Sequence, residues 1–67
     1  MIVVCEFKLR VYLSEDGNLR LISKDALNVK FIDGGVVILR EDGSTLNLSG
    51  ATIIEVDAER QAVILKP

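Results

Sequence analysis

Residues 29–39 read Val-Lys-Phe-Ile-Asp-Gly-Gly-Val-Val-Ile-Leu and place two apolar runs on either side of a turn sequence. Asp-Gly between apolar runs is a strong short-range hairpin signal, because Gly readily adopts the positive φ that a tight turn requires. Asp16-Gly17 and Asp42-Gly43 lie in a similar context. The three Asp-Gly pairs therefore predict three β-hairpin turns.

Apolar alternation extends the strand pattern to both ends of the chain. Every odd position of residues 3–13 is apolar, which predicts a long first strand with one face on the core. Phe7 and Phe31 both fall at core positions of this pattern. Residues 24–26 are expected to connect two strands and have room for one helical turn. Further short strands are predicted at residues 19–22, 29–32, 36–39, 45–48, 52–56 and 62–65.

The whole chain, residues 1–67, is predicted to form a single all-β domain. Six or seven short strands with tight turns and no amphipathic helix favour a small antiparallel meander closed into a barrel. Closure is favoured because free strand edges recruit other chains. No linker, repeat or low-complexity tract interrupts the pattern.

The size of the chain predicts association. A domain of 67 residues buries only about 60% of its unfolded surface and has a thin stability margin. A single cysteine excludes an internal disulfide, and apolar residues make up 49% of the sequence. We therefore expect a homodimer, because two-fold association is the commonest form of assembly.

Charge and hydropathy restrict the partners and the compartment. Eight basic and ten acidic residues give a net charge of −2, which disfavours nucleic acid as a ligand. No apolar stretch approaches the roughly 20 residues that span a bilayer, and residues 1–4 are too short for a signal peptide. The expectation is a cytoplasmic protein with no membrane partner and a reduced thiol.

Cys5 is the only cysteine of a chain that has no histidine. A thiolate is then the only soft metal ligand and the only strong nucleophile available. One thiolate cannot complete a metal site, so a second copy of the chain would supply the second sulfur. The alternative is a structural role, because Cys5 is in phase with the apolar odd positions and cysteine is often buried.

Two other groups of charged residues are candidates for function. The acids of the predicted turns match no calcium loop and are expected to face water or to bond nearby backbone amides. A basic stripe beside Tyr12 would suit single-stranded nucleic acid, but cross-strand ion pairing accounts better for these bases. The acids are Glu15, Asp16, Glu41, Asp42 and Asp57, and the bases are Lys8, Arg10, Arg20, Lys30 and Arg40.

Catalysis has no sequence support. Glycine loops that bind nucleotides, zinc-type Cys/His spacings and Ser-His-Asp sets are all missing from the sequence. The chain is therefore not expected to be an enzyme.

Three segments resemble the CooT-like family of small nickel-binding proteins. Residues 5–13, Cys-Glu-Phe-Lys-Leu-Arg-Val-Tyr-Leu, are similar to that family's N-terminal cysteine and its Lys/Arg-Val-Tyr-Leu strand. Residues 50–57, Gly-Ala-Thr-Ile-Ile-Glu-Val-Asp, are similar to a Gly-x-Ile-x-Glu-Ile-Asp stretch. Residues 62–65, Ala-Val-Ile-Leu, are similar to the apolar last strand. The resemblance covers nearly the whole chain.

The resemblance implies an SH3-like barrel and a homodimer that holds Ni(II) through Cys5 of each subunit. It implies a role in nickel delivery to a metalloenzyme-maturation partner; some relatives have instead been labelled predicted RNA-binding proteins. The family cysteine is usually residue two, whereas four residues precede Cys5 here, so its thiolate has no adjacent terminal amine. The alternative function is a non-metal module that binds protein or RNA and keeps Cys5 as a buried structural residue.

Overall fold

The computed structural model describes residues 8–67. These residues form six strands and no helix. The strands are β1 (Leu9–Glu15), β2 (Asn18–Ile32), β3 (Gly35–Arg40), β4 (Thr45–Ser49), β5 (Thr52–Asp57) and β6 (Ala62–Lys66). The all-β prediction is confirmed. The part of the predicted first strand that precedes Lys8 lies outside the described residues.

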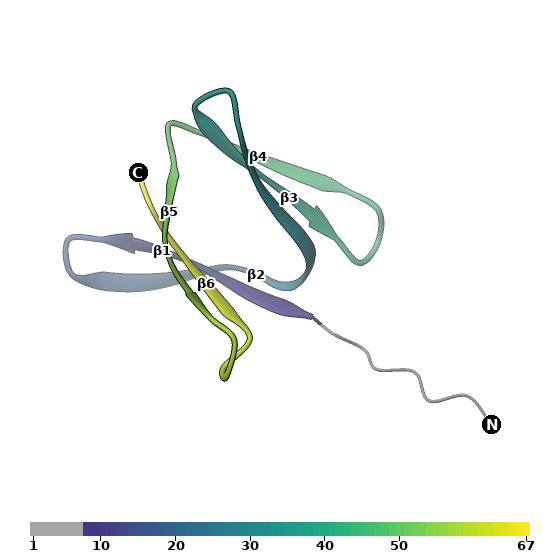
Figure 1. The fold of residues 1–67 in the computed structure, drawn as a ribbon, viewed down its shortest axis with the longest axis horizontal. Coiled ribbons are helices and arrows are strands. Elements are labelled where there is room, and N and C mark those ends of the chain that lie inside the picture. Colours follow the sequence, from purple (N-terminus) through teal and green to yellow (C-terminus); the bar gives the residue numbers. More distant parts are fainter. Residues whose placement is uncertain (1–7) are drawn as a thin grey trace.

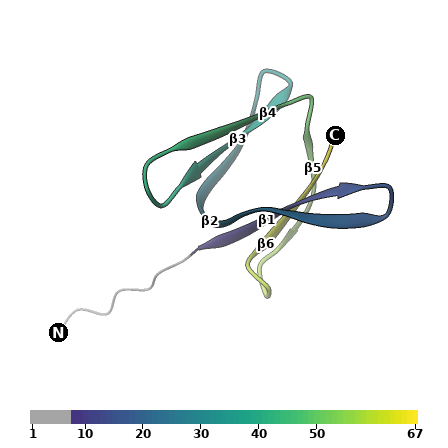
Figure 2. The same ribbon diagram turned by 180° about the vertical axis from the view of Figure 1, so that it is seen from behind.

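All six strands belong to one sheet in the order β4-β3-β2-β1-β6-β5. In Figures 1 and 2 the β5–β6 hairpin lies beside β1, and β3 and β4 lie at the other end of the long β2 strand. The end strands β4 and β5 are not neighbours in this order, so the sheet formed by residues 8–67 is open and does not close into a barrel.

One pairing departs from the predicted antiparallel meander. β6 runs parallel to β1, with Arg10 opposite Ala62 and Leu13 opposite Leu65, whereas the other four pairings are antiparallel. Between β4 and β5, Gly50 has a φ of 81° and donates its backbone N–H to the Gly34 carbonyl. The chain bends there without making a hairpin, so β5 pairs with β6 instead of with β4.

Two of the three Asp-Gly pairs form two-residue turns with positive φ at both positions. Asp33 and Gly34 have φ values of 49° and 75°, and the first turn, at Asp16-Gly17, is alike. Such turns match the natural twist of the strands that they join. The third pair is part of the four-residue connection between β3 and β4, in which Gly43, at φ 87°, donates its backbone N–H to the Arg40 carbonyl. The three predicted hairpin turns are thus confirmed, with two different geometries.

β2 is a single strand of 15 residues where the sequence pattern predicts two strands and a connection. Its first half pairs with β1 and its second half with β3. An irregularity between Ala26 and Asn28 lets the strand bend without ending, because a bulge inserts one extra residue. The helical turn considered for residues 24–26 is therefore wrong.

The core lies on the concave face of the bent sheet. Ile38 and Leu65 are completely buried, and the inward positions of β1, β3 and β6 alternate with exposed or half-buried ones. This is the period-two pattern expected for a sheet with one face on the core. The cluster of buried apolar residues consists of Val11, Leu13, Ala26, Val36, Ile38, Ala51, Val63 and Leu65.

Candidate functional site

Cys5, the candidate metal ligand, lies outside the described residues. The structure begins at Lys8, and β1 begins at Leu9, four positions after the cysteine. Within residues 8–67 no three Asp, Glu, His or Cys side chains gather closely enough to hold a metal ion.

The acids of the turns act locally, as the sequence predicts. Glu15 pairs with Arg20 across the first hairpin at 3.5 Å, and Glu41 pairs with Lys8 at 2.7 Å. Asp57 accepts a hydrogen bond of 3.2 Å from the backbone N–H of Arg60. These acids stand in three different turns and each has a partner nearby, so they form neither a catalytic carboxylate pair nor a calcium loop.

Asp42 organises the β3–β4 loop. Its Oδ1 accepts hydrogen bonds from the Ser44 hydroxyl at 2.5 Å and from the Ser44 backbone N–H at 2.9 Å. The Ser44 Oγ in turn accepts a hydrogen bond of 2.8 Å from Arg40 Nε. The hydroxyl bond first, and the backbone bond second, lower the pKa of Asp42 below its ordinary value of 3.8. Any stability from this loop is present above that value and is lost as the pH falls through the lowered pKa.

Replacing Ser44 by Ala is expected to raise the pKa of Asp42 toward its ordinary value, because the hydroxyl bond favours the ionised carboxylate. The measurement is an NMR titration of the Asp42 carboxyl carbon between about pH 2 and pH 6. Ser49→Ala, in β4 but away from the loop, is the control and should leave the titration unchanged. An unaltered Asp42 titration in Ser44→Ala would contradict this account of the loop.

The bases do not form a stripe on one face of the sheet. Arg20 lies opposite the buried Leu13, on the side of the core, whereas Lys30 lies opposite Val37 on the outer face. Arg10 donates a hydrogen bond of 3.0 Å to the Arg60 carbonyl, and two other bases are ion-paired as described above. The arrangement agrees with cross-strand pairing and offers no continuous track for a phosphate backbone.

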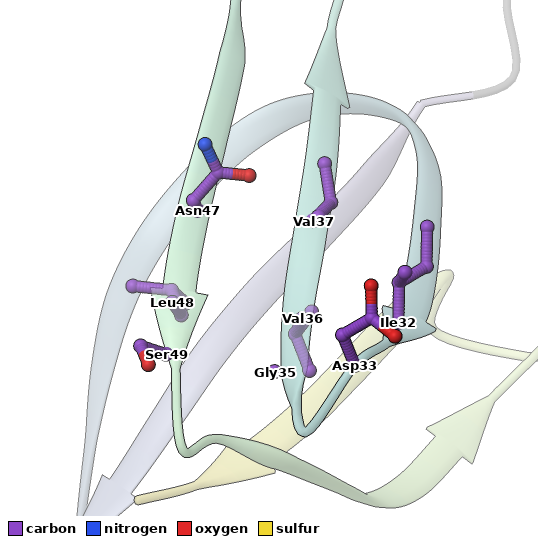
Figure 3. A pocket seen from close by; sticks show the side chains of 8 residues that line it. All are labelled: Ile32, Asp33, Gly35, Val36, Val37, Asn47, Leu48 and Ser49. Carbon is purple, nitrogen blue, oxygen red and sulfur yellow. The ribbon is translucent and has the colours of Figure 1, made fainter.

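A shallow hollow lies on the outer face of β2, β3 and β4. Its volume is about 180 Å³, and Figure 3 shows its lining side chains on the three strands. Gly35 contributes no side chain to this wall. A Cβ at this position would lie 2.9 Å from the Leu48 carbonyl oxygen. A second hollow of about 280 Å³ on the same face lies beside Val37 and Leu39. Ile32, Val37 and Leu39 thus form an apolar band, and polar side chains from β2 and β4 border it.

Another hollow, of about 220 Å³, lies on the outer face of β1, β6 and β5. Tyr12 and Ile64, which are opposite each other in the sheet, form part of its apolar lining. Arg10, Glu55 and Asp57 add charges of both signs around this lining. The sequence pattern places Tyr12 on an outward face correctly but does not reveal that charges of both signs surround it.

Phe31 corrects one expectation about the core. It lies opposite Val36, on the side of the core, yet 56% of its surface is exposed. The alternation therefore gives the correct face. Among the described residues, however, β2 pairs at this point with β3 on one side and with no strand on the other. The open edge leaves the ring uncovered.

A scan against models of known protein families and a search of curated proteins gave no match to this chain. No helix of residues 8–67 is long and apolar enough to cross a membrane.

Proposed function

We propose that this chain is a small nickel-binding accessory protein that holds Ni(II) between the Cys5 thiolates of two copies. The observation that carries the proposal is the single thiol of a histidine-free chain, located four positions before β1 begins at Leu9. The resemblance of residues 5–13 to the CooT-like family supports the choice of metal. The all-β sheet agrees with the fold class that this resemblance implies.

The donor chemistry explains why two copies are needed. Ni(II) accepts sulfur and nitrogen donors in tetragonal sites, and one thiolate leaves most of such a site unfilled. Residues 8–67 contain no group of three or more Asp, Glu, His or Cys side chains that could hold the metal by themselves. A second Cys5 across a two-fold axis is the simplest source of a further soft donor.

A site of this kind suits delivery better than catalysis. A cysteine thiol must lose its proton to bind a metal ion, so protons compete with the metal. The affinity for Ni(II) therefore falls as the pH falls. The chain offers no histidine as a general base. We infer a role in carrying nickel to a maturation partner in the cytoplasm.

Titration of the reduced protein with Ni(II) at neutral pH tests the proposal, with ultraviolet absorbance as the readout. A thiolate-to-nickel charge-transfer band is expected to saturate at one metal ion per two chains and to be missing in Cys5→Ser. Circular dichroism should show the same sheet in both proteins, so that loss of the band is not loss of the fold. No band in the wild type, or the same response from both proteins, would refute the site.

A second candidate is a non-metal interaction module, favoured by the apolar band of Ile32, Val37 and Leu39 on the outer face. Exposed apolar patches bordered by polar residues often contact another protein. The two candidates respond differently to Cys5→Ser, which removes metal binding and leaves this outer face intact. An RNA ligand would be recognised instead by binding that weakens steeply with salt.

A further inference from the structure

β4 is the strand at one end of the sheet, and no strand of residues 8–67 pairs with its outer edge (Figure 1). Such edges pair readily with other strands, so proteins usually protect them with charges, bulges or proline. The sequence of β4, Thr-Leu-Asn-Leu-Ser, contains neither a charge nor a proline. Its pairing with β3 also runs without a register shift from Ser49 to Thr45. This edge therefore lacks the usual protection.

The strand at the opposite end of the sheet is protected. β5 carries the charged residues Glu55 and Asp57, and an irregularity between Ile53 and Glu55 interrupts its pairing with β6. Both features oppose the addition of another strand. Of the two end strands, β4 is thus the one that is suited to accept a partner.

Backbone hydrogen bonds show which residues of β4 face its outer edge. The Arg40 N–H donates to the Ser44 carbonyl at one end of the β3–β4 pair, and the Gly50 N–H donates to the Gly34 carbonyl at the other end. Both bonds have the same phase, so the backbone groups of the even positions between them point toward β3. The backbone N–H and C=O groups of the odd positions point away from β3, toward the outer edge. These positions are Thr45, Asn47 and Ser49.

The side chains of β4 divide between the two faces of the sheet. Leu46 and Leu48 are half-buried and pack against the core. The polar side chains are exposed on the outer face, where Asn47 and Ser49 border the hollow of about 180 Å³ (Figure 3). A strand added at this edge would cover the two leucines and continue both faces of the sheet.

The sequence of β4 is self-complementary about its central residue. In either direction from Asn47 it gives first a leucine and then a hydroxyl residue. A two-fold interface requires such a surface, because the same patch on both subunits has to fit itself. We propose that the outer edge of β4 binds the same edge of a second copy of the chain, in an antiparallel pair with Asn47 at the two-fold axis.

This register satisfies the backbone and the side chains together. Asn47 lies opposite Asn47 of the second copy, Thr45 lies opposite Ser49, and Leu46 lies opposite Leu48. The outward-facing odd positions then meet each other, and each such pair exchanges two hydrogen bonds. Amides and hydroxyls meet on the outer face, and leucines meet on the core face. A shift by one residue would instead set odd positions against even ones and lose both matches.

The size of the interface indicates a reversible dimer. A pair of five-residue strands is smaller than the interfaces of permanent dimers, so association should depend on concentration. The strand pair involves only residues 45–49 and needs no metal. The interface therefore does not rest on the proposed nickel function, and either can be wrong without the other.

Sedimentation equilibrium of the full chain tests the interface, in EDTA and a reducing agent so that neither nickel nor a disulfide joins two chains. The mass of the wild type should rise from 7.4 kDa toward twice that value as the concentration increases. Asn47→Lys and Asn47→Glu each place like charges at the axis and should weaken dimerisation at least about tenfold. An equimolar mixture of the two variants should restore the dimer, because opposite charges then meet.

Thr52→Lys is the matched control, because it adds the same charge to an exposed residue of the other end strand, β5. It should dimerise like the wild type, and circular dichroism should show the same sheet in all variants. A wild type that stays monomeric would refute the proposal. Charge variants of Asn47 that dimerise as well as the wild type would place the contact elsewhere. A mixture that stays monomeric would overturn the axis at Asn47.

Amide hydrogen exchange of the unmodified protein tests the strand pairing itself. The Asn47 N–H should exchange at least about tenfold more slowly in concentrated than in dilute solution, because the second copy then accepts its hydrogen bond. The Leu46 N–H points toward β3 and should be protected equally at both concentrations. Exchange at Asn47 that does not change with concentration would refute the pairing.

Discussion

Ile38→Ala is expected to destabilise the fold by about 2–5 kcal/mol and to leave much of the protein unfolded at room temperature. Ile38 is completely buried, and β3 is an interior strand between β2 and β4. Truncation therefore removes apolar contacts on the core face and leaves a cavity. A domain of this size commonly has only about 3–5 kcal/mol of net stability, so the loss is comparable with the whole.

Urea unfolding followed by circular dichroism measures this loss. Ile54→Ala is the matched control, because the same atoms are removed from a side chain that is 50% exposed at the irregularity of β5. The control should cost less than about 1 kcal/mol. Equal effects of the two substitutions would contradict the assignment of the core.

Gly35→Ala is expected to destabilise the β3–β4 hairpin by about 1–3 kcal/mol, because overpacking forces backbone shifts. The new Cβ would lie 2.9 Å from the Leu48 carbonyl oxygen and 3.3 Å from Ser49 Cα. Both neighbours are backbone atoms of β4, which cannot rotate away as a side chain can. The hollow between these strands should lose part of its volume in the same variant.

Chemical denaturation together with NMR spectra measures the effect of Gly35→Ala. Gly34→Ala is the control: no atom lies within 4 Å of its new Cβ, so its cost comes only from the φ of 75°. Gly35→Ala should shift the amide signals of Leu48 and Ser49, and Gly34→Ala should leave them nearly unchanged. Unchanged stability and unchanged β4 signals in Gly35→Ala would contradict the close approach.

Local patterns predicted the strands and turns well. Alternation placed Val11 and Leu13 on the core, and the Asp-Gly pairs located all three hairpin turns. These features depend on neighbouring residues, so a sequence window contains the information for them. The continuous β2 strand was missed because Lys24 and Asp25 resemble a polar connection, whereas a bulge lets such residues stay in a strand.

Long-range features were not predictable in the same way. The parallel pairing of β1 with β6 joins residues about 50 positions apart, and no local pattern contains that information. The exposure of Phe31 likewise depends on which strand borders β2, not on the alternation that placed it on the core face. The hollow at Gly35 arises from the approach of β4, so it too required the assembled sheet.

The candidate site was predictable only in part. The expectation that the turn acids serve local roles agrees with the bonds of Asp42 and Asp57. The metal site at Cys5 stays a prediction, because the residue lies outside the described chain.

The parallel pair of β1 and β6 has a consequence for the order of folding. Arg10 and Ala62 are partners although they lie far apart in the sequence. During synthesis β1 emerges before β6, so this edge of β1 stays uncovered until residues 62–66 have followed. Closing so long a loop is slow relative to forming a hairpin. Full cooperativity should therefore arise only after release of the last strand, and a nascent chain that lacks β6 is the species most exposed to misassociation.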